Sequence, residues 1–439
     1  MLLLLRQYLQ ECNAPPYPSV LHAEDSAYSF VLTERGMEKF IGCGLESAIV
    51  FASQMTIPNL DFDIDLGVTR IKLILSDINF ANFNVEEVQV DVPDDNPMSG
   101  AALNANVELK LNWKFQQSSY PYINDQGTGQ ILLKGANLRV VVDILCDFIE
   151  CPGHLKVDVH RASLDFEALS IILSGGSSWI YQSLIDLVIN AVQDSICDII
   201  SKVLVNGMTD LMNQMLQSNG YYEEYAKYPD IIKDDRFAGD VVNKRGFMVV
   251  QLAGYIYKFD NLSDQFINST LLPKKTFNRF NEEIQFELTR AGFNNFLYIF
   301  HKYHNVFSKP DSFEVISTPT IEFYNVQAVM NLQISKNGVQ HDLQLVGLPQ
   351  LRTDIIHNKT GSSTHNVTQI FFKFQTYTSD LQNDENEVVL EWVNAQIQHA
   401  NYQIANTPFM DMNLMKFVFD PSQDVLRLVG SNPETCGKI

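Results

Sequence analysis

The chain contains 439 residues, which at about 100 to 200 residues per domain allows two to four domains. Hydrophobic residues make up 46% and charged residues 19%, an ordinary globular composition that excludes a disordered or fibrous protein. The 31 basic against 52 acidic residues give a formal net charge of -21, which disfavours nucleic acid and anionic membranes as partners. No apolar run reaches the roughly 18 residues of a membrane-spanning helix, so no transmembrane span is predicted.

The amino-terminal segment, residues 1–27, is interpreted as a leader. Met1–Leu5 followed by Arg6 is similar to part of a signal peptide, but the apolar run is shorter than the roughly 7 to 15 residues of a complete one. This pattern fits either an incomplete amino terminus or no signal. Four sequons would fit a glycoprotein, although that number is expected by chance at this composition.

A first helix is predicted after Thr33, which can cap it, because apolar residues recur at helical spacing up to Ile57-Pro58. From Leu60 to about Leu173 apolar and polar residues alternate, as in strands with one solvated face. This region predicts a long antiparallel meander.

A second, long helix is predicted from Ser177 or Ser178 to about Gln217, after the break at Gly175-Gly176. Its roughly 40 residues would span about 60 Å, so it must lie along an extended sheet or across two domains. The polar residues that follow, 219–240, are interpreted as a linker.

The second half repeats the order of helix, strands and helix. A helix is expected from Thr289 and another near 387–403. The expected strands are 246–259, 320–333, 340–346, 369–375, 414–419 and 425–429. The sequence Leu32–Gly36 is similar to Leu288–Gly292, and each opens an apolar-faced helix, which indicates an internal duplication.

Several short motifs in this order resemble the bactericidal/permeability-increasing protein and lipopolysaccharide-binding protein family, of the tubular lipid-binding superfamily. The motifs are Leu32–Gly36, Ile57-Pro58, Ser76-Asp77-Ile78 with Phe80 and Phe83, Asn104-Ala105-Asn106 leading to Trp113-Lys114, Cys151 before the helix that carries Cys197, Phe247–Phe259 and Phe417–Val429.

The resemblance implies an α+β fold: an elongated boomerang of two pseudo-symmetric β-barrel domains, each with long apolar helices, joined by a central antiparallel sheet. The amino-terminal lipid-binding barrel would occupy 28–218, and the carboxy-terminal one, with its return strands, 241–439. It also implies a secreted or lumenal protein with one disulfide, Cys151–Cys197, for which Cys146 is an alternative partner.

The resemblance further implies that each barrel takes the acyl chains of a phospholipid or similar amphiphile, without chemistry. The lining candidates are the apolar faces of the helices. They are Phe40, Leu45, Ile49, Leu184, Val188 and Ile200 for the first pocket, and Phe293, Phe296, Phe300 and Trp392 for the second. Any one of these residues could instead be plain core.

Lipopolysaccharide recognition is doubtful on charge, although the bactericidal members use basic residues near the tip of the first barrel. Residues 57–127 hold eleven acidic and four basic residues, about -7 in all, and this surface repels lipid phosphates unless the cations cluster. Binding of acyl chains depends on apolar area and is therefore still expected despite the acidic charge of this region.

Catalytic and metal motifs are weak. The chain has no GxSxG, HExxH, phosphate-loop or GxGxxG motif. His301 and His304 could share a metal but lack an evident third ligand, and Asp61, Asp63 and Asp65 fit a solvated strand face. We therefore expect a monomeric, non-enzymatic lipid-binding or lipid-transfer protein without cofactor, for which a role in innate defence is open. The alternatives are an interaction protein with filled barrels and, third, a lipid-metabolising enzyme.

Overall fold

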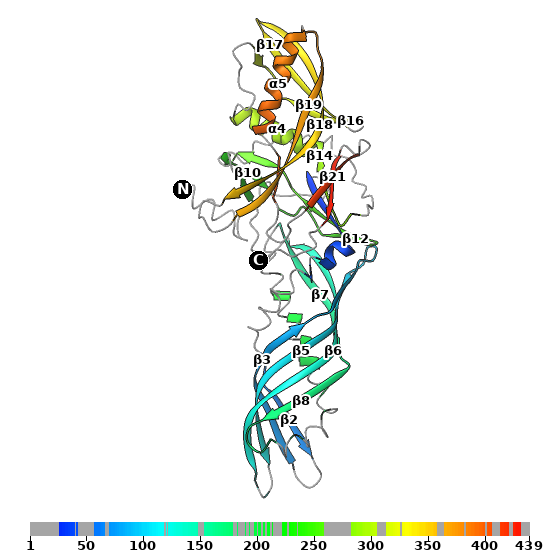
Figure 1. Cartoon of the computed structure of the whole chain (residues 1–439), viewed down its shortest axis with the longest axis vertical. Helices are drawn as coiled ribbons and strands as arrows, with labels where there is room; N and C mark the ends of the chain where they lie inside the picture. Colours follow the sequence, from blue (N-terminus) through cyan, green and yellow to red (C-terminus); the bar gives the residue numbers. More distant parts are fainter. Residues whose placement is uncertain are drawn as a thin grey trace. The chain divides into compact units, whose positions relative to one another are not determined.

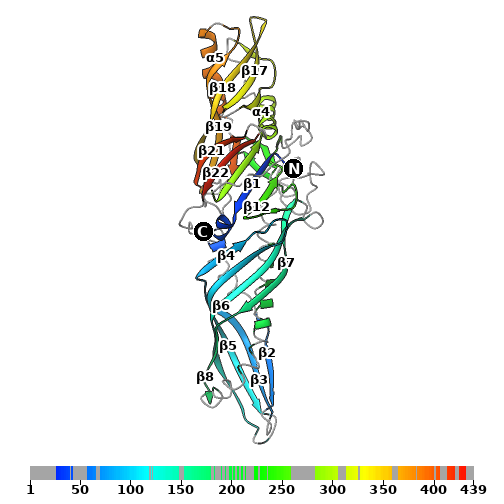
Figure 2. The ribbon, with the colours of Figure 1, turned by 90° about the vertical axis from the view of Figure 1, so that its right-hand side faces the viewer.

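The computed structural model describes two compact units of the chain. Unit 1 comprises residues 1–36, 145–155 and 217–439, and unit 2 comprises 37–144 and 156–216. The described residues are 26–39, 41–42, 57–65, 70–117, 120, 122–147, 153–178, scattered positions between 182 and 213, 222–225, 228–234, 236–258, 282–304, 313–324, 327–357, 364–381, 383–399, 402–405, 413–420 and 425–431. Figures 1 and 2 show the ribbon in two views.

Unit 2 is built on a seven-stranded antiparallel sheet, which confirms the predicted meander. The order is β2-β3-β5-β6-β7, with β4 paired to β5 and β8 paired to β6. The strands are β2 (Leu60–Asp65), β3 (Arg70–Asn84), β4 (Glu87–Asp91), β5 (Met98–Gln117), β6 (Asn124–Asp147), β7 (His154–Asp165) and β8 (Ala168–Ser174). In both views β3, β5 and β6 run side by side as long strands. On β5, Leu109, Leu111 and Trp113 are buried while the residues between them are exposed, as strand periodicity requires.

Helical residues of unit 2 cover part of the apolar face of this sheet. Residues 37–39 and 41–42 are helical, and so is every described position from 182 to 213. Ile189 and Ile199 pack against the buried cluster of the sheet. The other residues of the predicted long helix lie outside the described part of the chain, so its continuity stays a prediction.

Unit 1 contains a six-stranded antiparallel sheet that joins the start of the chain to its end. Its order is β11-β12-β1-β14-β22-β21. These strands are β1 (Tyr28–Thr33), β11 (Val242–Lys244), β12 (Phe247–Leu252), β14 (Ile284–Thr289), β21 (Asn413–Asp420) and β22 (Val425–Ser431). The order reads alike from both edges, because β1 and β14 lie side by side and each is flanked by a hairpin.

The two similar sequence segments occupy equivalent places on either side of the β1–β14 pair. Thr33 donates its N–H and its hydroxyl to the Glu283 carbonyl at 3.0 and 3.1 Å. Thr289 makes the same two bonds to the Ala27 carbonyl at 2.9 and 3.1 Å. Each threonine hydroxyl also accepts a bond from a glycine N–H three residues on, which caps the following helix.

A second antiparallel sheet of unit 1 packs against two helices. Its order is β15-β17-β18-β19-β20, with β16 paired to β17. The elements are β15 (Glu314–Val315), β16 (Thr320–Tyr324), β17 (Gln327–Lys336), β18 (Val339–His357), β19 (Thr364–Thr378), β20 (Tyr402–Ala405), α4 (Arg290–His304) and α5 (Asn383–His399). In both figures α5 lies along the strands of this sheet.

A small three-stranded sheet includes residues 222–225 and 228–234, which lie in the segment predicted to be a linker. It consists of β13 (Ile256–Lys258), β10 (Tyr228–Asp234) and β9 (Tyr222–Tyr225). Asp234, the last residue of β10, forms an ion pair with Arg236 at 2.7 Å, and the two side chains are 0% and 2% exposed. The charges of this segment are therefore partly internal.

The sheets of both units are open at their edges within the described residues. The end strands of the seven-stranded sheet, β2 and β7, are not paired with each other, and neither are β15 and β20. The described architecture is mostly sheet with few helices, whereas an α+β fold with long apolar helices was expected, and the described strands do not close into the two barrels that the resemblance implied.

Asparagine side chains of α4 and α5 pair with the free edges of strands. Asn295 accepts a hydrogen bond from the Ile256 N–H at 2.7 Å and donates one to the Ile256 carbonyl at 3.2 Å. Asn294 brackets Ile321 of β16 in the same way, at 2.7 and 3.2 Å. A carboxamide thus replaces one residue of a missing neighbouring strand.

The same arrangement recurs on α5 and in unit 2. Asn394 of α5 brackets Phe374 of β19 at 2.8 and 2.9 Å. Asn213 brackets Val157 of β7 at 2.7 and 3.4 Å. Gln182 accepts a bond from the Leu173 N–H at 3.0 Å and donates to the Ile171 carbonyl at 2.7 Å. Helices are therefore fixed to strand edges by polar contacts.

Replacement of Asn295 by alanine should lower the free energy of unfolding of the chain by about 2 kcal/mol or more, because two buried backbone groups lose their partner. Asn295 is 0% exposed. Urea unfolding followed by circular dichroism measures the change. Gln333→Ala is the control, since Gln333 makes an exposed bond to Asp342 at 2.8 Å and its loss should cost less than about 0.5 kcal/mol. Equal effects of the two substitutions would contradict the assigned role.

Candidate functional site

The apolar face of the seven-stranded sheet is the most extensive apolar surface that the structure describes in unit 2. Its buried residues come from β2, β3, β5, β6, β7 and β8, and include Leu75, Trp113 and Ile131. Partly buried residues, among them Phe62 and Phe83, lie at its margin. The helical residues Ile189 and Ile199 pack on this face, which has no titratable side chain in its buried cluster. Such a surface can bury hydrocarbon.

The six candidates for the first pocket stay untested. Phe40, Leu45, Ile49, Leu184, Val188 and Ile200 all lie outside the described residues. Their neighbours Ile189 and Ile199 support an apolar interface between this helix and the sheet.

The opposite face of this sheet carries the acidic surface, and two of its four cations are paired with carboxylates. Lys72 lies 2.8 Å from Asp61, and Arg70 lies 3.3 Å from Asp65 across the β2–β3 pair. The hydrogen bond and charge of Asp61 raise the pKa of Lys72. These pairs are solvent-exposed and leave the surface with its excess of carboxylates.

The aromatic candidates for the second pocket are buried together in unit 1. Phe293, Phe296 and Phe300 are between 0% and 3% exposed. Phe296 lies 4.7 Å from Phe300 and 5.6 Å from Phe293, measured between ring centroids, and Phe293 lies 4.9 Å from Phe372 of β19. They form an aromatic cluster between α4 and the second sheet, so their lining of a lipid pocket stays a prediction.

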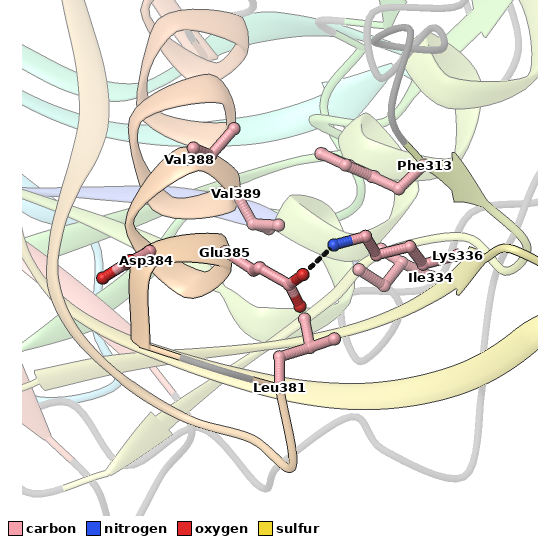
Figure 3. Close-up of a pocket in the computed structure, with 8 residues that line it drawn as sticks. All are labelled: Phe313, Ile334, Lys336, Leu381, Asp384, Glu385, Val388 and Val389. Atoms are coloured by element: carbon pink, nitrogen blue, oxygen red, sulfur yellow. Dashed lines mark hydrogen bonds and ion pairs between the residues drawn. The ribbon is translucent and has the colours of Figure 1, made fainter.

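A recess of about 310 Å³ lies between α5 and β17. It is lined by Phe313, Ile334, Lys336, Leu381, Asp384, Glu385, Val388 and Val389. Figure 3 shows Lys336 reaching toward Glu385 of α5 with the apolar residues around this ion pair. The predicted residue Trp392 is close by, since its ring contacts Phe313 edge-on at 5.1 Å. The recess offers an apolar space beside one cation and two carboxylates.

Sequence reasoning missed the recess residues other than Trp392. Val388 and Val389 lie one turn after Asp384 and Glu385 on α5, and Ile334 and Lys336 share a face of β17. Helical and strand periodicity predict that the residues of each element share a face. Nothing in the sequence shows that α5 lies against β17.

His301 and His304, which were considered as metal ligands, lie in different surroundings. His304 Nε2 lies 3.1 Å from Asp230, and burial lowers the pKa of His301. Among the described residues, no three His, Cys, Asp or Glu side chains gather in a way that could hold a metal ion. In the same part of the chain, no helix combines the length and apolarity needed to cross a membrane.

Of the disulfide residues, Cys151 lies outside the described part of the chain, so its pairing with Cys197 stays a prediction. The alternative partner, Cys146, is a buried free thiol. Its backbone N–H donates to Asp240 at 2.7 Å and its Sγ donates to the Phe237 carbonyl at 3.7 Å. Cys146 thus forms no disulfide in this structure, and the pairing of Cys151 stays a prediction.

Comparisons with known proteins agree with this architecture. Residues 45–215 match the model of the LBP / BPI / CETP family, N-terminal domain. A BPI/LBP family protein of Arabidopsis thaliana is 23% identical over 205 residues, which are 46% of this chain and 41% of that protein. The crystal structure of lipopolysaccharide binding protein superposes with a TM-score of 0.57 at 13% identity, covering 92% of this chain and 98% of that one. Residues 45–215 therefore form an N-terminal domain of the LBP/BPI/CETP family type.

The family-model match and the structural likeness cover different parts of the chain. The family model covers the seven-stranded sheet and the helical positions that follow it. The structural likeness extends over both units and at 13% identity shows the fold alone. The chain matches about two fifths of the length of its plant relative.

We expect Cys146, which lies in the segment that matches the LBP/BPI/CETP family, to react slowly with iodoacetamide in the folded protein. Burial raises the pKa of its thiol to about 11, so at pH 8 the thiolate is scarce and labelling should be about a hundredfold slower than for an exposed cysteine. Labelling should accelerate as the pH rises toward 11. Peptide mass spectrometry measures it, and urea-unfolded protein is the control. Rapid labelling of Cys146 in the folded state would contradict its burial.

The same labelling tests the Cys151–Cys197 pair. In urea without a reductant, Cys146 should be labelled while Cys151 and Cys197 are protected, and a reductant should expose both. Labelling of Cys197 without reduction would reject the disulfide.

Proposed function

We propose that the protein binds and carries phospholipid or a similar amphiphile, without catalysis, by covering acyl chains between the long helix and the apolar face of the seven-stranded sheet. The observation that carries this proposal is the continuous apolar face on which Ile189 and Ile199 pack. A bound chain would extend the contacts that these side chains already make.

The energetics favour such a ligand. Each methylene moved from water into an apolar environment contributes about 0.8 kcal/mol, so two acyl chains provide a large driving force before the entropic costs of binding. The family match and the likeness to lipopolysaccharide binding protein support the same reading, since the family binds lipids without enzymatic activity. The acidic outer face disfavours lipopolysaccharide and other strongly anionic head groups as ligands.

A second compartment is proposed in unit 1, at the recess between α5 and β17. Val389 and Leu381 would contact the hydrocarbon end of an amphiphile, and the Lys336–Glu385 pair would lie beside its polar group. We also propose that the protein is a secreted or lumenal monomer with a Cys151–Cys197 disulfide. Residues before 28 would form a leader, and the chain would divide into its two domains near 219–240. A part in innate defence is compatible with this function.

One observation favours the second candidate function, an interaction protein that carries no lipid in this half. The aromatic cluster of Phe293, Phe296, Phe300 and Phe372 fills the space between α4 and the second sheet with the chain's own side chains. If lipid binds only in unit 2, unit 1 would serve as a partner-binding scaffold.

Native mass spectrometry of the purified protein, followed by solvent extraction, tests the carrier function. We expect one or two phospholipid-sized adducts per chain after expression in eukaryotic cells. Ile199→Glu should reduce the lipid content by more than half, because a carboxylate at the helix–sheet interface is costly to bury beside acyl chains. Asn206→Glu adds the same charge at an exposed position nearby and should leave the lipid content unchanged.

A bare mass for the wild-type protein would reject the carrier function and favour the interaction protein. Equal lipid content in folded Ile199→Glu and Asn206→Glu proteins would place the lipid elsewhere. Circular dichroism verifies that both variants are folded.

A further inference from the structure

The turn between β5 and β6 carries a group of exposed apolar residues. Tyr120 is 86% exposed, Tyr122 is 65% exposed and Ile123 is 44% exposed. The two tyrosine rings contact each other edge-on, with centroids 6.4 Å apart. Side chains of this size usually bury most of their surface, so their clustering on one turn requires an explanation. We call this group the tyrosine turn.

The turn holds these side chains outward by backbone geometry. Tyr122 has a φ of +49°, in the left-handed region that bulky residues rarely adopt. The Gln117 N–H donates to the Ile123 carbonyl at 2.9 Å and closes the hairpin below the turn. A strained tyrosine conformation on a closed hairpin is retained where the exposed position itself is useful.

The base of the turn is firmly anchored. Asp125 accepts hydrogen bonds from the backbone N–H groups of Gln126 at 2.9 Å and Ser177 at 2.6 Å. Trp113, on the neighbouring part of β5, is buried and donates its indole N–H to the Ser174 carbonyl at 3.1 Å. The turn therefore projects from the end of the sheet where β8 gives way to the long helix.

The local charge identifies the kind of surface that the tyrosine turn fits. Residues 117–124 contain no charged side chain, and the next residue along the chain, Asp125, has its carboxylate hydrogen-bonded to two backbone N–H groups. The strands behind the turn are acidic, which repels an anionic bilayer. Tyrosine favours the boundary between head groups and hydrocarbon, where its ring is buried and its hydroxyl stays hydrated.

We propose that Tyr120, Tyr122 and Ile123 form a docking tip for the surface of a zwitterionic, phosphatidylcholine-type lipid bilayer. This inference rests on the proposed lipid-carrier function. Docking would bring the end of the helix–sheet interface to the bilayer that donates or accepts the lipid. It adds the partner surface and the residues that contact it.

Sedimentation with sucrose-loaded phosphatidylcholine vesicles tests the docking tip. The double variant Tyr120→Ser/Tyr122→Ser should lower the vesicle partition coefficient by about tenfold, since two aromatic rings no longer insert. Tyr324→Ser is the matched control, because Tyr324 is 69% exposed on β16 in unit 1 and its loss should change binding less than twofold. Vesicles containing 30% phosphatidylserine should bind the wild-type protein more weakly.

Unchanged binding in the double variant, stronger binding to the anionic vesicles, or no binding of the wild-type protein to either vesicle would overturn the proposal. Lipid content by native mass spectrometry separates this inference from the carrier function. A double variant that keeps its lipid but loses the vesicles supports the tip and leaves the carrier function standing. A lipid-free protein that still binds vesicles through the tyrosines rejects the carrier function alone.

Discussion

The fold depends on how its open sheets satisfy their edges. An edge strand exposes N–H and C=O groups that must bond to water or to another part of the protein, and beneath a helix water is excluded. Here carboxamides from the helices supply the missing partners, for instance Asn295 at Ile256 and Asn213 at Val157. The helices are thereby positioned by directional bonds, and the apolar side chains between helix and sheet do not have to fix the helix by tight packing.

Positioning a helix by hydrogen bonds and not by apolar packing suits a lipid-binding interface. A helix held only by close packing would lose its position if a ligand entered between it and the sheet, since interiors are packed at near-crystal density. Gln182 and Asn213 are helical positions far apart in the chain, and they hydrogen-bond to β8 and β7 respectively. The positions between them, among them Ile189 and Ile199, can then face hydrocarbon of the protein or of a ligand.

The sequence predicts the parts of the fold that periodicity and local chemistry control. Alternation identifies the strands of unit 2, and the repeated Thr33 and Thr289 motifs correspond to matching caps on the β1–β14 pair. A charge with a buried partner is not visible in the sequence: Asp234 and Arg236 lie in the polar stretch 219–240, which predicts a solvated linker, yet they form an ion pair in the interior. The edge-bracketing asparagines could not be predicted, because a polar residue on a helix carries no sign of the strand that it meets. The tyrosine turn was equally invisible, since Tyr120 and Tyr122 read as ordinary hairpin residues until their exposure is known.

Charge and apolar area act on different steps of lipid handling, and this protein separates them in space. The carboxylates of β2 and β3 lie on the solvated face, partly matched by Lys72 and Arg70, while the buried cluster on the other face is uncharged. Electrostatics acts over about 8 to 10 Å at physiological ionic strength and therefore governs which surfaces the protein approaches. Burial of hydrocarbon acts only on contact and governs what is retained. A strongly acidic chain with a fold similar to that of lipopolysaccharide binding protein can thus keep an apolar helix–sheet interface while its outer face repels negative charge.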